Sequence, residues 1–148
     1  MNKESKTTIA NEESMESRLE QILNDALIKA TDTYSVPPQI IWVDNSTIAT
    51  LGNFSASTGK AKAKKTFNVS ALVAASLSNG TVLNYRACLP EGKRRILYVD
   101  TEQSRYHCHN VLARILKLAG LPTDMDNQNL DFIGLREYTP AIRMEVID

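Results

Sequence analysis

Residues 59 to 66 read GKAKAKKT and have the composition of a phosphate-binding loop. Such a loop needs a first glycine for a turn, a second glycine for close backbone approach, a lysine for the terminal phosphates and a hydroxyl for Mg²⁺. The usual spacing of these residues is G-x-x-x-x-G-K-[ST]. The segment can be aligned with this pattern in two ways, and each alignment assigns the lysine differently.

In the first alignment, Gly59 and Lys60 form the Gly-Lys pair, which places Phe54 at the first glycine and Ala61 at the hydroxyl. Two of the four roles are then vacant. In the second alignment, Gly59 is the first glycine, Lys65 is the lysine and Thr66 supplies the hydroxyl. Only the second glycine is replaced, by Lys64, so we prefer this alignment. A plain basic surface turn is the alternative interpretation of the same residues.

The second alignment also suits the segment after it. A nearly continuous apolar run begins at Phe67 and continues to about Ser78, which predicts a buried helix over residues 65–78. The lysine and the hydroxyl would then lie on its first turn, where the main-chain amides face an anion. The predicted nucleotide-binding residues are Gly59, Lys60, Ala61, Lys62, Ala63, Lys64, Lys65, Thr66 and Phe67, with Thr66 as the Mg²⁺ ligand.

A second chemical group follows the run RRILYVD, residues 94–100, which predicts a strand buried on both faces. Glu102 comes just after this strand, at the carboxyl edge of the predicted sheet. A carboxylate there can orient or deprotonate a water molecule that attacks a γ-phosphate. In the alternative interpretation, Asp100 or Ser104 caps the next helix and Glu102 is a favourable charge in its first turn.

The remaining elements follow from periodicity and turn residues. We expect a polar, disordered start, an amphipathic helix from about Glu12 to Ala30, and a linker with two prolines at 31–38. Strands or a hairpin follow at 39–44 and 47–54, then a helix at 108–119, a strand at 130–135 and a helix capped by Thr139. Helices alternating with strands predict a parallel α/β sheet, with ligands bound at the carboxyl ends of its strands.

Composition limits the other function classes. The 148 residues carry 17 basic and 17 acidic side chains, so a nucleic-acid contact would need a local basic patch. Cys88 and Cys108 have no metal-binding spacing and are interpreted as packing residues, while His107 and His109 would point to different faces of a helix. The sequence has no membrane-length apolar run and no signal peptide at its start, so a cytoplasmic protein is expected.

The phrases TLGNFSASTGKAKAKKTF, ILYVDTEQS and GLREYTP resemble RecA-like P-loop ATPases. The resemblance is strongest to the RepA-like group of AAA-type ATPases carried by mobile elements of Bacteroides-type bacteria, and it covers residues 37–148. It implies a RecA-like P-loop NTPase fold, a parallel sheet with flanking helices, present here as an incomplete N-terminal portion. Residues 1–36 would form a preceding segment with the polar start, helix and linker.

The resemblance also implies a function. The chain would bind ATP and Mg²⁺, with Lys65 and Glu102 in catalytic roles, as part of a helicase-like ATPase of DNA replication or mobilisation. DNA and further copies of the chain, in a hexamer-like assembly, are the implied partners. The chain departs from this family in two ways. Lys64 replaces a glycine, and residues 103–148 contain no apolar strand that ends in the aspartate with which the family supports Mg²⁺. The alternative is therefore a truncated, catalytically inactive module that binds nucleotide or DNA.

Overall fold

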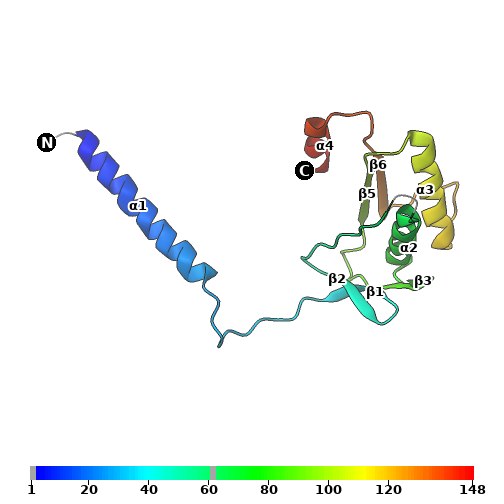
Figure 1. The fold of residues 1–148 in the computed structure, drawn as a ribbon, viewed down its shortest axis with the longest axis horizontal. Coiled ribbons are helices and arrows are strands. Elements are labelled where there is room, and N and C mark those ends of the chain that lie inside the picture. The colour runs from blue at the N-terminus through cyan, green and yellow to red at the C-terminus, as the bar shows by residue number, and fades with distance from the viewer. Residues whose placement is uncertain (1–2, 61–62) are drawn as a thin grey trace. The chain divides into compact units, whose positions relative to one another are not determined.

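The computed structural model describes residues 3–60 and 63–148, with side chains from Met15 onward (Figure 1). Contacts between residues divide the chain into two units, Met1–Val36 and Pro37–Asp148. The division falls inside the segment at 31–38 that the two prolines marked as a linker. Ala61 and Lys62 of the candidate loop lie outside the described residues.

The first unit consists of helix α1, Lys3–Ala26, and the linker. The expectation of a disordered start is wrong from Lys3 onward, where the helix already begins, and the lysines and glutamates of this polar segment are good helix formers. The helix also ends four residues earlier than expected. Its apolar stripe is exposed within this unit, with 61% of Met15, 59% of Leu19 and 68% of Leu23 accessible to solvent.

An antiparallel sheet opens the second unit. Strands β1, Gln39–Val43, and β2, Ser46–Thr50, form a hairpin, and the strand order is β2-β1-β4-β3 with β3 at Thr81–Val82 and β4 at Tyr85–Ala87. The predicted hairpin is confirmed, but the expectation that these strands join a parallel sheet is wrong. A connection of two residues, with Asp44 at φ 50°, can only reverse the chain, since parallel neighbours need a long crossover.

A parallel pair forms the second sheet. Strands β5, Ile96–Asp100, and β6, Leu130–Gly134, pair in register from Ile96 with Leu130 to Asp100 with Gly134. Helix α3, Arg105–Leu118, makes the crossover between them. Two strands are joined in this sheet within the described residues, and Leu97 is 49% exposed, so the prediction that β5 is buried on both faces is wrong.

Helix α2, Lys65–Ser78, is the centre of the core and confirms the predicted bounds. Ser70, Ala71, Ala74 and Ala75 have no accessible surface, and the helix contacts α3, β3, β4 and β5. Small side chains on several faces allow these elements to approach the helix closely. The helix ends at Asn79 in a left-handed conformation, with the Gly80 amide donating to the Ala75 carbonyl over 3.1 Å.

The last helix, α4, spans Pro140–Ile147 and begins as the Thr139-Pro140 pair predicted. The Thr139 hydroxyl accepts a hydrogen bond from the Ile142 amide over 3.5 Å. No helix in the described ranges is both long enough and apolar enough to cross a lipid bilayer.

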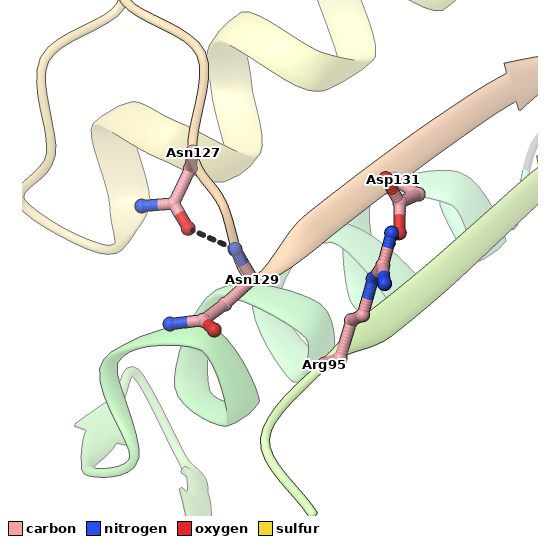
Figure 2. A network of polar contacts seen from close by, with 4 residues as sticks. All are labelled: Arg95, Asn127, Asn129 and Asp131. Carbon is pink, nitrogen blue, oxygen red and sulfur yellow. Dashed lines mark hydrogen bonds and ion pairs between the residues drawn. The ribbon is translucent and has the colours of Figure 1, made fainter.

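Polar contacts outside the core connect strands and the residues beside them. Arg95, the residue before β5, forms an ion pair of 2.7 Å with Asp131 of β6, and the Asn127 side chain accepts from the Asn129 amide over 2.9 Å just before β6 (Figure 2). In the antiparallel sheet, the Arg86 guanidinium lies 3.8 Å from the centroid of the Trp42 ring. The Trp42 indole donates to Gln39 over 3.3 Å.

Candidate functional site

The structure brings Lys65, Thr66 and Glu102 to one open cavity of about 280 Å³. They come from the start of α2 and from the residues after β5, which are 35 or more positions apart in the chain. The cavity is lined by Ser57, Lys65, Thr66, Val69, Tyr98, Val99, Asp100, Thr101, Glu102 and Gln103. Two residues of the preferred alignment, Lys65 and Thr66, therefore meet the carboxylate chosen from sequence at one cavity, whereas Gly59, Ala63 and Lys64 are not part of its lining.

Lys65 is the first residue of α2, as the preferred alignment requires. The amides of Phe67 and Asn68 both donate to the Lys64 carbonyl, and these bonds open the helix. The main-chain amides of the first turn otherwise lack partners inside a helix and give that end a positive partial charge. The Lys65 ammonium adds a full charge beside them and donates to the Gly59 carbonyl over 2.7 Å.

Lys64 has a left-handed backbone conformation, φ 56° and ψ 26°, directly before α2. This is the position at which the motif has its second glycine, and glycine is the residue that adopts this conformation without steric cost. The backbone thus takes the path expected for glycine while a lysine occupies the position. Gly59 is different, because an added Cβ there would lie 3.5 Å from the Ala63 Cβ, an ordinary contact.

Lys60, the lysine of the rejected alignment, is exposed and does not line the cavity. Its carbonyl accepts a hydrogen bond from the Ala63 amide over 3.2 Å. Phe67 is 39% exposed and also lies outside the cavity lining. Residues 59–64 form the lysine loop, of which Ala61 and Lys62 lie outside the described residues.

The other side of the cavity is a short acidic turn, residues 100–104. The Asp100 carboxylate accepts hydrogen bonds from the main-chain amides of Glu102 over 2.9 Å and Gln103 over 2.7 Å, and from the Gln103 side chain over 2.7 Å. Helix α3 begins only at Arg105, so the alternative in which Glu102 is a first-turn charge is wrong. Ser104 precedes the helix, and its hydroxyl pairs with His107 Nδ1 at 2.8 Å.

Burial changes the acidity of two side chains beside the acidic turn. Burial, followed by the nearby Asp100 carboxylate, raises the pKa of the Tyr98 hydroxyl. The same two causes, in the same order, raise the pKa of the Cys108 thiol, whose sulfur contacts the Gln103 carbonyl at 3.6 Å. Both groups are thereby kept neutral, which excludes a reactive thiolate at Cys108 near pH 7.

The two cysteines behave differently, because Cys108 is buried in the core while Cys88 is exposed. The interpretation of Cys88 as a packing residue is therefore wrong. Among the residues that the structure describes, no group of three or more His, Cys, Asp or Glu side chains could hold a metal ion.

Several lining residues were missed by the sequence analysis. Ser57 precedes the first glycine by two positions, and Gln103 follows the predicted carboxylate directly, so proximity to the motifs was the available signal. Val69 and Tyr98 carried no such signal. A larger cavity of about 820 Å³, lined by residues including Arg95, His109, Asp124 and Val146, contains none of the predicted site residues.

Comparisons of this chain with protein-family models, with curated proteins and with solved structures found no match. A function for the chain therefore rests on the geometry of the cavity and on the motif residues that line it.

Proposed function

We propose that the chain is an ATP-binding module that holds Mg²⁺-ATP between the start of α2 and the acidic turn. The observation that carries the proposal is the shared cavity of Lys65, Thr66 and Glu102. A basic surface turn would have no reason to place a cation, a hydroxyl and a carboxylate around one hollow at the carboxyl end of a parallel strand, where ligands of α/β proteins bind.

The cavity fits the phosphate groups of a nucleotide. Its volume of about 280 Å³ is just under the usual range for small-molecule sites, ~300–1,000 Å³, so the triphosphate would occupy it and the nucleoside would extend outward. The exposed Lys65 ammonium and the first amides of α2 would bind phosphate oxygens. Thr66 would supply one ligand to Mg²⁺, and this suffices because Mg²⁺ is commonly held by few protein ligands together with substrate phosphates and water.

Glu102 would orient the water that attacks the γ-phosphate. Its main-chain amide donates to the Asp100 carboxylate, and Glu102 is an exposed residue that lines the cavity together with Lys65 and Thr66. A positioned carboxylate contributes about 10²- to 10⁴-fold to such a reaction. With Mg²⁺ bound, the metal would neutralise charge that develops on the phosphates.

The resemblance to RecA- and RepA-like ATPases extends this proposal to a process. On that basis the module would belong to a helicase-like ATPase of DNA replication or mobilisation, with DNA and a hexamer-like homo-oligomer as partners. The nucleotide would then be bound and hydrolysed within a larger assembly.

A binding module without turnover is the second candidate, and the observation that favours it is Lys64. A lysine stands at this left-handed position, where the motif has a glycine that lets the backbone approach the phosphates closely. Measurement of ATP hydrolysis with and without single-stranded DNA distinguishes the two candidates. Hydrolysis supports the ATPase, whereas nucleotide binding with no hydrolysis in either condition supports the inactive module.

A pair of lysine variants tests the site itself. Lys65→Ala is expected to weaken Mg²⁺-ATP binding by about 100-fold, since hydrogen bonds to a charged group are worth roughly 1.5–3 kcal/mol. Lys60→Ala removes the same charge from the same region of the chain but outside the cavity, and it should bind ATP as the parent protein does. Titration with a fluorescent ATP analogue measures both, and equal losses in the two variants would refute the site.

A further inference from the structure

The two carboxylates of the acidic turn have different surroundings. Asp100 is 8% exposed and lies at the end of β5, whereas Glu102 is exposed at the cavity. Both are acidic and both line the same hollow. The shared lining alone therefore does not distinguish which of them faces the reacting water and what the other one does.

The hydrogen bonds of Asp100 settle its role. One oxygen, Oδ1, accepts from the amides of Glu102 and Gln103, and the other, Oδ2, accepts from the Gln103 side chain. Both oxygens of the carboxylate thus accept hydrogen bonds from residues of the acidic turn. A carboxylate that is bound in this way has little capacity left for a metal ion or for a proton from water.

The main chain fixes Asp100 from the other side as well. Its carbonyl accepts a hydrogen bond from the Leu135 amide over 2.7 Å, which ties the end of β5 to the residue that follows β6. The pairing of Asp100 with Gly134 continues the parallel register up to the same point. The acidic turn therefore starts from a rigid position in the sheet.

We infer that Asp100 is a positioning residue that holds Glu102 at the phosphate cavity by binding the amides of the acidic turn. This inference rests on the proposed function, and it assigns the two carboxylates separate tasks. Glu102 acts on the water, and Asp100 acts on the backbone that carries Glu102. The Gln103 side chain adds to this arrangement, because it donates a hydrogen bond to Oδ2 of Asp100, and Gln103 lines the cavity together with Glu102.

Two substitutions at Asp100 separate geometry from charge. Asp100→Ala removes both acceptors and frees the turn, whereas Asp100→Asn keeps an oxygen that can accept from the two amides. Asp131→Ala is the matched control, because Asp131 is also an aspartate of the parallel pair but binds Arg95. In NMR-detected hydrogen exchange, the amides of Glu102 and Gln103 should exchange at least about tenfold faster in Asp100→Ala, with protection restored in Asp100→Asn. Exchange in the middle of α2 reports whether each variant is folded.

ATP measurements on the same full chains complete the test. Asp100→Ala should bind Mg²⁺-ATP within about threefold of the parent protein and hydrolyse it about 100-fold more slowly, because displacement of a catalytic group by ~1 Å has an effect of this size. Asp100→Asn should recover most of the rate, and Asp131→Ala should match the parent protein.

Three outcomes would overturn the inference. Unchanged exchange at Glu102 and Gln103 in a folded Asp100→Ala would show that Asp100 does not hold the turn. Loss of ATP binding as large as that of Lys65→Ala would show direct contact with the ligand, and a slow Asp100→Asn with restored protection would show that the charge itself is required. A parent protein without ATP binding would instead refute the proposed function, and the exchange measurement would still decide whether Asp100 holds the turn.

Discussion

The lysine loop lies between Ser57 and Lys65, which both line the cavity, and the acidic turn lines it directly, yet the two segments are held in different ways. In the lysine loop, the hydrogen bonds of the described residues are exposed, such as the 2.7 Å contact from Lys65 to the Gly59 carbonyl. In the acidic turn, three partly buried hydrogen bonds converge on Asp100. Exposed contacts exchange readily with water, so the loop can adjust to a ligand while the turn keeps its shape.

This difference suits the two tasks proposed for the site. A lysine that binds phosphate gains from a flexible stem, because it must exchange the Gly59 carbonyl for a phosphate oxygen. A carboxylate that positions water gains from a fixed backbone, since small displacements weaken catalysis strongly. The comparison predicts that substitution of Lys65 will mainly weaken ATP binding. Substitutions in the acidic turn should mainly lower the rate of hydrolysis and the stability of the fold.

The largest effect is expected for Glu102→Gln. The substitution keeps the size of the side chain and removes the base, so hydrolysis of Mg²⁺-ATP should fall by about 10²- to 10⁴-fold. Binding should be retained, because the phosphate contacts are assigned to Lys65 and the first turn of α2. Single-turnover hydrolysis with radiolabelled ATP measures the rate, and a variant as active as the parent protein would remove Glu102 from the reaction.

A smaller effect is expected on the free energy of unfolding, which should differ between variants of the acidic turn and of Lys65. Asp100→Ala leaves two amides of the acidic turn without their acceptor and should lower the free energy of unfolding by about 2–3 kcal/mol. Lys65→Ala removes one exposed hydrogen bond and should change it by no more than about 0.5 kcal/mol. Urea denaturation followed by circular dichroism compares them, and similar losses would contradict the assigned difference in rigidity.

Glycine substitutions at two left-handed positions should have opposite effects. Lys64→Gly relieves a conformation that costs a lysine about 1 kcal/mol and should stabilise the folded chain by up to that amount. Asn79→Gly is the control, because Asn79 also has a positive φ of 48° but binds the main chain of Leu89 with its side chain. It should destabilise by about 1 kcal/mol.

Both glycine variants are measured by thermal unfolding. If Lys64→Gly were as destabilising as Asn79→Gly, the lysine side chain would have to contribute contacts that outweigh the strain. Tighter ATP binding by Lys64→Gly would further support the view that the motif position is better served by glycine.

The smallest effect concerns alkaline pH. Burial raises the pKa of the Cys108 thiol above its ordinary value of 9.0, so the folded state keeps the proton longer than the unfolded state does. The stabilisation is complete below pH 9 and is lost as pH rises through the folded-state pKa. Urea denaturation at pH 8 and pH 10 should show a decline that is reduced in Cys108→Ala, and an equal decline would assign it to other groups, such as Tyr98.

Local patterns predicted several elements of the fold well. The apolar run from Phe67 to about Ser78 predicted the buried helix α2. The Thr139-Pro140 pair predicted the start of α4. Strands β3 and β4 were missed, because two and three residues are too short to show an alternating pattern. The pairing of β1 with β4 was also hidden, since it joins residues far apart in the chain, such as Trp42 with Arg86, and β4 packs against α2.

The candidate site was also predicted only in part, because local patterns identify some of its residues and long-range packing brings in the others. Lys65, Thr66 and Glu102 each follow a local rule, namely a helix start or the end of a strand, and they do line one cavity. Ser57 and Tyr98 join them only through the fold. Lys64 has the left-handed backbone that glycine adopts readily, at the position where the preferred alignment expects a glycine.

Trp42 is the single tryptophan of the chain and lies in the antiparallel sheet, under the Arg86 guanidinium and bound to Gln39. It is absent from the lining of the candidate cavity, which draws on the segment before α2, on α2 and on β5 with the acidic turn. Its fluorescence is therefore a built-in optical probe of one sheet. An emission change on nucleotide addition would show that binding alters the surroundings of Trp42 in the antiparallel sheet, while a steady emission would show that these surroundings stay the same.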